Sequence, residues 1–470
     1  MKRFLKLFVT ALLVVTTAIS MVACGKSGND DGGTGANKSI RVAYWSSAGA
    51  ALERAGVECF ATGFKAKNPG VEVNIDILDD YVNQFQNNMA TGSSKYDVFL
   101  VPDGYFGTWV GTGVMEDLTE RAQNSTVFNL EDMYDNVTER YMYNNQTKQL
   151  GSGSIYALPK DVGPYVMYYN KTILEEFYVD GDDTKESIYD HYEEYLTATE
   201  SFDIDVAQEM WKDIKANDKT MYAVGNVQIE GLVWSNGGDF IDDSKIPAEG
   251  ALTDPKVQEA YEKYLELVHE GLMPDGATAG MGDPATLFQG GSCATLITGR
   301  WAVNSFRAIE DFDWDVCPVP AFADEGDDPT LNSSSGSVAL AIHKRSKNKE
   351  LAWDFIEYVA SLEGQLTATR SGFAIPFYDT PEALAALQEA DAGKLPTNTE
   401  CFINGAKNQQ RNRMSALSYS YRWVAQLDTL SGYIFLKPGE TGYQTVAEFL
   451  AGANKEITNV LKVDWNEYKL

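Results

Sequence analysis

The chain has 470 residues, of which 44% are hydrophobic and 12% are aromatic, and its formal net charge is −30. This length is ample for a large core and predicts two or three domains. The acidity argues against a protein that binds nucleic acid or anionic lipid headgroups, because both require a basic surface.

The first 23 residues are predicted to be a secretory signal peptide. Basic residues precede an apolar stretch, residues 7–22, and a small residue stands at the cleavage edge. A retained membrane anchor is the alternative, since the stretch is near the minimum spanning length. The ending Met21-Val22-Ala23-Cys24 resembles the bacterial lipobox, although Met21 stands where Leu is usual. The lipobox implies that Cys24 carries a lipid such as palmitate and becomes the mature N-terminus.

Residues 24–37 are rich in Gly, Ser, Asn and Asp, which predicts a lipidated, flexible tether. Such a coil reaches roughly 20 Å. No later segment is long and apolar enough to span a bilayer. We therefore expect the protein on the extracellular face of the cytoplasmic membrane, or in the periplasm if an outer membrane exists, held by its lipid anchor alone.

The next part of the chain alternates strands and helices. Residues 40–45 and 71–77 alternate as strands, and a helical pattern between them ends at Asn68-Pro69-Gly70. A short helix then leads to a buried strand, residues 96–101. This order predicts a mostly parallel sheet, whose ligands bind beyond the carboxyl ends of the strands. The side chains placed at that edge are Trp45, Ser46, Asp103 and Tyr105.

Two apolar runs, residues 155–158 and 165–169, are separated by a polar stretch that contains Pro159 and Pro164. Each proline lacks the N–H that a central strand uses in its ladder. We therefore expect the chain to leave one sheet here and to enter another. Such a segment is typical of a hinge between two lobes.

The second half of the chain contains further strands at residues 221–225, 293–298 and 313–318. Asp254 followed by Pro255 predicts a helix start. The Ser-rich segment before an apolar strand at 338–342 suggests a second crossing between lobes.

Residues 370–376 suggest a third crossing. A helix from about residue 348 lies between these two crossings. From Pro381 the tail is expected to be mostly helical, with an amphipathic run at 414–430.

The sequence contains no clear motif of a common enzyme class. The three histidines are scattered, and neither a zinc motif, a nucleophile elbow nor a phosphate-binding loop occurs. We expect no metal and no cofactor. With 68 Asp and Glu residues, a glycosidase-like carboxylate pair stays possible by chance.

The four cysteines after Cys24 show no metal-type spacing, and we favour buried free thiols while leaving any pairing open. These are Cys59, Cys293, Cys317 and Cys401.

Aromatic residues gather at the predicted strand ends and crossings. Sugar rings stack their C–H faces on aromatic rings, while their hydroxyls need polar partners. The alternative for each ring is a place in the core. Trp234 and Trp301 are favoured for binding because each flanks a Gly-rich turn. The full set is Trp45, Tyr105, Trp109, Tyr165, Trp234, Trp301 and Phe373.

Several of these stretches together resemble the bacterial extracellular solute-binding proteins of family 1, the maltose-binding-like receptors of sugar ABC importers. The resemblance covers about residues 40–376. It is carried by segments 64–73, 155–171, 234–238, 299–301 and 338–353.

The resemblance implies an α/β fold of two lobes, each a mostly parallel sheet flanked by helices, joined by three hinge crossings. The lobes are expected at residues 38–161 with 338–372, and at 162–337 with 373–470. It also implies delivery of the ligand to an ABC permease in the membrane.

Position by position, the resemblance implies ligand contacts from both lobes and from the hinge, with Lys160 and Asp161 facing a cleft. The implied contacts are Trp45, Ser46, Asp103, Tyr105, Lys160, Asp161, Tyr165, Trp234, Asn236, Asp239, Arg300, Trp301, Ser337, Arg370 and Phe373.

We therefore predict a monomeric receptor, not an enzyme, that closes on a carbohydrate. The aromatic residues favour a neutral oligosaccharide. Lys160, Arg300 and Arg370 would suit an acidic sugar if they converged. The alternatives are a secreted lipoprotein enzyme acting on carbohydrate, and a sensor or adhesion protein with the same fold.

Overall fold

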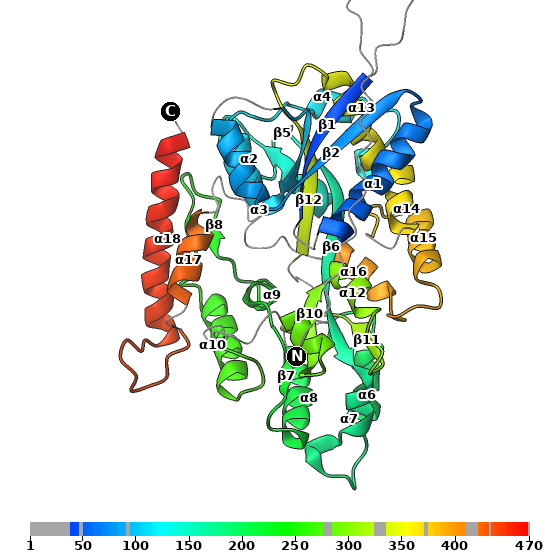
Figure 1. The fold of residues 1–470 in the computed structure, drawn as a ribbon. Coiled ribbons are helices and arrows are strands. Elements are labelled where there is room, and N and C mark those ends of the chain that lie inside the picture. Colours follow the sequence, from blue (N-terminus) through cyan, green and yellow to red (C-terminus); the bar gives the residue numbers. More distant parts are fainter. Residues whose placement is uncertain are drawn as a thin grey trace, which may run out of the picture. The chain divides into compact units, whose positions relative to one another are not determined.

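The computed structural model describes residues 38–46, 50–90, 95–275, 284–323, 335–370, 375–408, 422–431 and 434–468 (Figure 1). The predicted signal peptide and tether, including Cys24, lie outside these ranges, as do Phe373 and the first part of the amphipathic run.

The first sheet begins with the predicted alternation of strands and helices. β1 pairs in parallel with both β2 and β3, which confirms the parallel sheet expected for this part of the chain. Asn68 and Pro69 follow the end of the first helix, as expected. These elements are β1 (Lys38–Trp45), α1 (Ala50–Lys67), β2 (Val71–Leu78), α2 (Tyr81–Ala90) and β3 (Val98–Pro102).

One long strand, β6 (Leu158–Asn170), belongs to both halves of the main sheet. Its first half pairs antiparallel with β12 (Ser335–Ile342), which also pairs with β3, and the two strands run side by side in Figure 1. Its second half pairs antiparallel with β10 (Cys293–Gly299) and β11 (Trp314–Cys317). β7 (Tyr222–Val224) lies parallel to β10. The strand order is β2-β1-β3-β12-β6-β10-β7, with β11 also on β6.

The expected break between two strands is therefore a change of partner within one continuous strand. The register with β12 shifts between Asp161 and Pro159, so Lys160 is an extra, bulged residue, and a proline is tolerated beside a bulge. Pro164 pairs opposite Ser335, where the pairing with β12 ends, and Tyr165 already faces Gly299 of β10. Pro164, which has no N–H to donate, therefore lies where the pairing of β6 with β12 ends and its pairing with β10 begins.

Helices and short hairpins complete the chain. The helices of the first half are α3 (Asp103–Gly111), α4 (Thr119–Gln123), α5 (Asp135–Thr138), α6 (Lys171–Glu176), α7 (Ile188–Leu196), α8 (Ile204–Asn217) and α9 (Ile229–Ser235). Those of the second half are α10 (Pro255–His269), α11 (Pro284–Gln289), α12 (Val303–Phe306), α13 (Lys349–Ala360), α14 (Leu362–Arg370), α15 (Pro381–Asp391), α16 (Glu400–Asn408), α17 (Arg422–Ser431) and α18 (Val446–Tyr468).

The remaining elements are short. The 3-10 helices are η1 (Leu130–Asp132), η2 (Glu139–Tyr141), η3 (Val179–Gly181) and η4 (Arg300–Ala302). β4 (Met142–Tyr143) pairs with β5 (Ser154–Ile155), and β8 (Ile241–Asp242) pairs with β9 (Glu249–Gly250).

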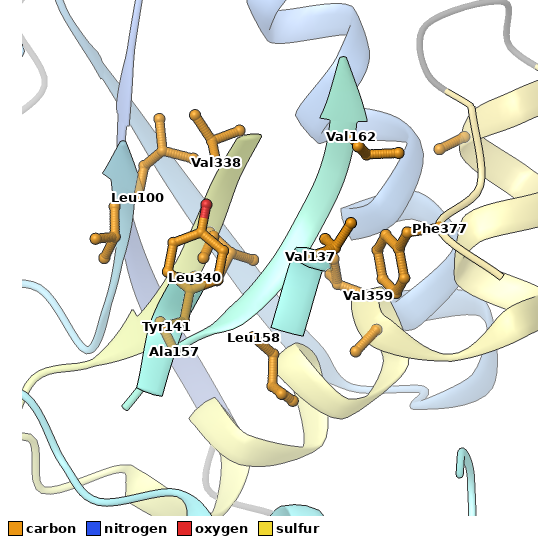
Figure 2. Packing of buried hydrophobic residues seen from close by; sticks show 14 of the residues in the cluster. Leu100, Val137, Tyr141, Ala157, Leu158, Val162, Val338, Leu340, Val359 and Phe377 are labelled. Atoms are coloured by element: carbon orange, nitrogen blue, oxygen red, sulfur yellow. The ribbon is translucent and has the colours of Figure 1, made fainter. Parts of the chain in front are cut away.

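Two hydrophobic cores lie on this framework. The first contains residues of β1, β3 and β12, and Figure 2 shows Leu100, Leu340 and Leu158 on the neighbouring strands β3, β12 and β6 within it. The second contains Met167 and Tyr169, whereas Tyr168 between them belongs to the first core. This alternation follows from the two-residue period of a strand, so β6 contributes one face to each core.

The lobe boundaries expected from the sequence stay a prediction. Two residues of α15, Ala383 and Leu387, pack in the first core, together with β1, β3 and β12. The loop after α15 is held by β11, where Asp315 Oδ1 accepts hydrogen bonds from the backbone of Thr397 at 2.8 Å and Asn398 at 3.1 Å. The connection from α15 to α16 is therefore fixed to β11.

Three of the described cysteines, Cys293, Cys317 and Cys401, carry free thiols, as expected. Cys293, Cys317 and Cys401 are buried, and Cys59 is half-buried. Burial raises the pKa of Cys293 to about 12. Within the described ranges, no helix is both long enough and apolar enough to pass through a bilayer.

Candidate functional site

A buried ion pair stands where β3 runs into α3. Asp103 is the first residue of α3, and its Oδ2 lies 3.4 Å from Nη1 of Arg140. The same oxygen accepts a hydrogen bond from the backbone N–H of Ser337 at 3.2 Å. Asp103 Oδ1 accepts from the backbone of Gly104 at 2.8 Å. The carboxylate therefore connects the end of β3 to β12 and to η2.

The network continues from β12 to β6. The Tyr141 hydroxyl donates to Ser337 Oγ at 2.9 Å, and Ser337 Oγ donates to the carbonyl of Asp161 at 2.9 Å. Asp161 Oδ1 accepts from the backbone N–H of Val338 at 3.3 Å. The predicted site residues Asp103, Asp161 and Ser337 are thus brought together.

Lys160 belongs to the same network. Its side chain is buried, its ammonium donates to Asp161 Oδ2, and it lies 5.7 Å from the ring centre of Tyr44. Its carbonyl accepts from Gln365 Nε2 at 2.9 Å. The bulge therefore turns Lys160 inward, whereas Asp161 keeps part of its surface in solvent. Lys160 is placed to orient Asp161.

Burial shifts the pKa values of the two η2 side chains. It lowers the pKa of Arg140, and the nearby Asp103 carboxylate opposes that effect. It raises the pKa of Tyr141, and Asp103 adds to this rise. Tyr141 therefore stays a hydrogen-bond donor at neutral pH.

An aromatic pair stands where β6 changes partner. Trp301 directly follows Arg300 and is 46% exposed. Its ring packs edge-to-face with Tyr165, with the ring centres 5.2 Å apart. A Cβ added to Gly163 would lie 2.8 Å from Cζ3 of Trp301, so the indole rests directly on the backbone of β6. Burial raises the pKa of Tyr165 to about 12, which keeps its hydroxyl protonated.

Trp45, Ser46 and Tyr105, which lie at or just beyond the ends of β1 and β3, are half-buried. Ser46 Oγ donates to Asp79 Oδ1 at 3.3 Å. The ring of Tyr105 lies 5.8 Å from that of Trp109, and Trp109 is fully buried. Trp109 is thus a core residue, while Trp45 and Tyr105 retain accessible surface.

The turn after α9 packs within the second core. Trp234 is 8% exposed, and its Nε1 lies 3.4 Å from Oδ1 of the exposed Asp239. Asn236 donates to the carbonyl of Lys256 at 2.8 Å and to Glu259 Oε2 at 2.9 Å. The amide of Asn236 is thus used to join this turn to α10.

The two predicted arginines lie apart from the network described above. Arg300 is 3% exposed, and its Nη2 lies 2.7 Å from Oδ2 of Asp391. Arg370 is exposed, and its Nε lies 3.5 Å from Oε2 of Glu389. Each guanidinium is therefore paired with a carboxylate of α15.

A sequence comparison identifies the family. The family model described as bacterial extracellular solute-binding protein matches residues 43–366, which is well over half of the 470 residues. The chain belongs to this family. The resemblance predicted from its motifs is thereby confirmed.

Two characterised proteins are similar to this solute-binding protein along most of their length. The erythritol/L-threitol-binding protein of Mycolicibacterium smegmatis is 22% identical over 77% of this chain and 76% of its own. The galactooligosaccharide-binding protein of Bacillus subtilis is 20% identical over 84% of this chain and 86% of its own.

Solved structures share the fold. An ABC substrate-binding protein of Listeria monocytogenes in complex with cycloalternan superimposes with a TM-score of 0.72, at 17% identity, over 91% of this chain and 100% of that one. The sugar-binding protein of Xanthomonas citri superimposes with a TM-score of 0.70, at 15% identity, over 92% of this chain and 99% of that one. The two-lobed α/β fold class predicted from the sequence is confirmed.

Sequence reasoning missed several residues of this solute-binding protein's network, namely Arg140, Tyr141 and Gln365. They lie in a 3-10 helix and a helix whose sequences contain no motif, and only their burial beside β12 and β6 reveals them. Among the residues that the structure describes, no cluster of His, Cys, Asp or Glu could hold a metal ion.

Proposed function

We propose that this solute-binding protein captures a carbohydrate, most suitably a neutral oligosaccharide, between its two lobes. The observation that carries the proposal is the aromatic pair of Trp301 and Tyr165 at the partner switch of β6. An exposed indole beside a protonated tyrosine offers a sugar both a stacking face and a hydrogen bond. The named ligands of the similar proteins, including galactooligosaccharide and cycloalternan, support the same class.

Seven of the predicted contact residues fall into two roles under this proposal. Trp45, Tyr105, Tyr165 and Trp301 keep accessible surface and would contact the sugar. Asp103, Lys160 and Ser337 are buried and would hold Asp161 and the crossing strands in place.

The pairing of charges in the structure favours a neutral ligand. The three cations that would have suited an acidic sugar each have a carboxylate partner: Lys160 has Asp161, Arg300 has Asp391 and Arg370 has Glu389. A pocket for an acidic sugar would have to break these pairs.

The proposed mechanism is capture without catalysis. The ligand would contact both lobes only in the closed state. It would therefore shift the population toward that state, to an extent set by the difference between its affinities for the closed and open states. The closed protein would then deliver the sugar to an ABC permease. We propose that it acts as a monomer, tethered through a lipid on Cys24 at the outer face of the cytoplasmic membrane, or in the periplasm if the cell has an outer membrane.

A thermal-shift screen tests the ligand class. The mature chain, produced without its lipid, is heated with monosaccharides, sugar alcohols, and galacto-, malto- and cyclic oligosaccharides, and with peptides as a contrasting class. A ligand that binds only the folded state at 100 times its Kd should add about 2.7 kcal/mol to the free energy of unfolding. A shift with peptides and none with any carbohydrate would overturn the proposal.

Calorimetric titration of the best ligand then tests the aromatic pair. Trp301→Ala should weaken binding by at least about tenfold, because stacking and apolar contact are lost. Tyr443→Ala removes another exposed aromatic side chain and serves as the control. Equal affinity of Trp301→Ala and the wild type would remove the pair from the binding site.

A further inference from the structure

A buried carboxylate, Asp391, holds two arginines from a different part of the chain. It is the last residue of α15 and is 4% exposed. Its Oδ2 lies 2.7 Å from Nη2 of Arg300, and its Oδ1 accepts from Nη2 of Arg307. Arg307 Nε also donates to the carbonyl of Leu395 at 2.7 Å, just beyond the helix. The turn after β10 is therefore fastened to the end of α15.

The buried guanidinium of Arg300 is paired with the Asp391 carboxylate. Nε and Nη1 of Arg300 are buried and have no hydrogen-bond partner in the part of the chain that the structure describes. The guanidinium otherwise lies over the ring of Phe402, 4.8 Å from its centre. A buried guanidinium whose carboxylate is removed is strongly disfavoured, so it must move or draw in water. Loss of Asp391 would therefore displace the Arg300 side chain.

The residue next to Arg300 is Trp301, so both side chains share one short 3-10 helix, η4. The carbonyl of Gly299 is fixed by the Tyr168 hydroxyl at 3.0 Å. A Cβ on Gly299 would lie 2.0 Å from Cζ3 of Trp301, so the indole folds back tightly over this turn. Arg300 anchors η4 from inside the protein, and Trp301 presents the outer face.

We propose that Asp391 is a positioning residue, which sets the place of the Trp301 indole on β6 through its ion pair with Arg300. The part of this proposal that concerns affinity rests on the proposed function, since it requires Trp301 to contact the sugar. The part that concerns the indole is independent of any ligand. Asp391 thereby influences the aromatic pair from another helix.

Fluorine NMR of protein labelled with 5-fluorotryptophan tests the indole directly, without ligand. Trp301→Phe identifies the Trp301 signal by its loss. Asp391→Asn should shift or broaden that signal, and Glu389→Gln, which changes an exposed carboxylate of the same helix, should leave it unchanged. An unchanged Trp301 signal in folded Asp391→Asn would overturn the proposal.

Arg300→Met is a second variant that guards against a failure to fold. It removes the anchor but leaves Asp391 paired with Arg307. It should change the Trp301 signal in the same way. If the signal stays in place in this variant, the proposal is likewise overturned.

A double-mutant cycle separates positioning from a general structural effect once a sugar ligand is known. Asp391→Asn should weaken binding by between about two- and tenfold in the wild type and by less than about 1.5-fold in Trp301→Ala, because coupled residues are not additive. Equal losses in both backgrounds would contradict the proposal. If no carbohydrate binds the wild type, the proposed function fails, and the NMR result still decides the role of Asp391.

Discussion

At the scale of single residues, the ion pair between Asp103 and Arg140 joins the end of β3 to η2, and Asp103 also accepts a hydrogen bond from β12. Asp103→Ala should lower the free energy of unfolding by about 3–5 kcal/mol, because it removes the carboxylate beside a buried guanidinium. Urea denaturation of the unliganded protein measures this difference.

The control for this experiment is Asp183→Ala, which changes an exposed carboxylate in the loop between η3 and α7. It should alter the stability by no more than about 0.5 kcal/mol. Similar stabilities of the two variants would show that the Asp103 ion pair contributes little to folding.

A second prediction concerns the glycines beneath Trp301. Gly163 and Gly336 are paired across β6 and β12, and both lie near the indole. An added Cβ would lie 2.8 Å from the indole at Gly163 but 3.6 Å at Gly336, which is an ordinary contact. Gly163→Ala should therefore displace Trp301 and weaken sugar binding several-fold, by about 1 kcal/mol. Gly336→Ala should bind as the wild type does.

Titration calorimetry with both variants and the identified sugar gives the comparison. A normal affinity for Gly163→Ala would mean that the indole can shift without loss of the ligand contact.

The sequence allowed Trp301 and Tyr165 to be named because both lie at recognisable strand ends. It could not distinguish Asp103 and Asp161, which join one network, from Arg300, which is paired with α15. That distinction depends on contacts between residues far apart in the chain. Asp391 is one of 68 acidic residues, and nothing local marks it as buried.

At the scale of elements, the turn between β12 and α13 contains a histidine that should respond to pH. His343 is buried, and its Nδ1 accepts from the backbone N–H of Arg345 at 3.1 Å. Burial lowers the pKa of His343, Arg345 lowers it further, and Asp97 opposes both. As the pH falls below about 6.5, the unfolded chain binds a proton that the folded chain resists.

The stability that His343 contributes is therefore present above that pH and is lost as the pH falls through the lower pKa of the folded state. Through this histidine, the free energy of unfolding should change by at most about 1.4 kcal/mol per pH unit. The free energy of unfolding should be measured between pH 7 and 5. Its slope against pH should decrease in His343→Gln and stay as in the wild type in His191→Gln, since His191 is exposed. An identical pH dependence in wild type and His343→Gln would rule this contribution out.

The elements themselves were largely predictable from periodicity and capping, as for α10, which begins at Pro255 after the cap Asp254. Pro159 and Pro164 predict a break between two strands, whereas β6 runs through both prolines. The local preferences of proline cannot predict the bulge at Lys160 or the change of partner at Tyr165. The bulge depends on the pairing with β12, and the change of partner depends on the pairing with β10.

At the scale of the whole molecule, capture between two lobes predicts a more compact protein in the presence of ligand. Small-angle X-ray scattering of the mature chain should show a smaller radius of gyration when the identified sugar is added. Trp301→Ala, measured at a sugar concentration that saturates only the wild type, should keep the radius of the unliganded protein. Saturated binding with no change in radius would favour a preformed site over hinge closure.

The continuity of β6 has a consequence for how the chain is assembled. Because one strand completes both parts of the main sheet, neither part can be excised with all its ladder hydrogen bonds intact. The two lobes should consequently unfold with strong mutual cooperativity, unlike domains joined only by linkers. New chain ends made within residues 158–170 would cut this shared strand. Ends placed in the exposed loop at residues 181–186 would leave it whole, which makes that loop the better point for circular permutation.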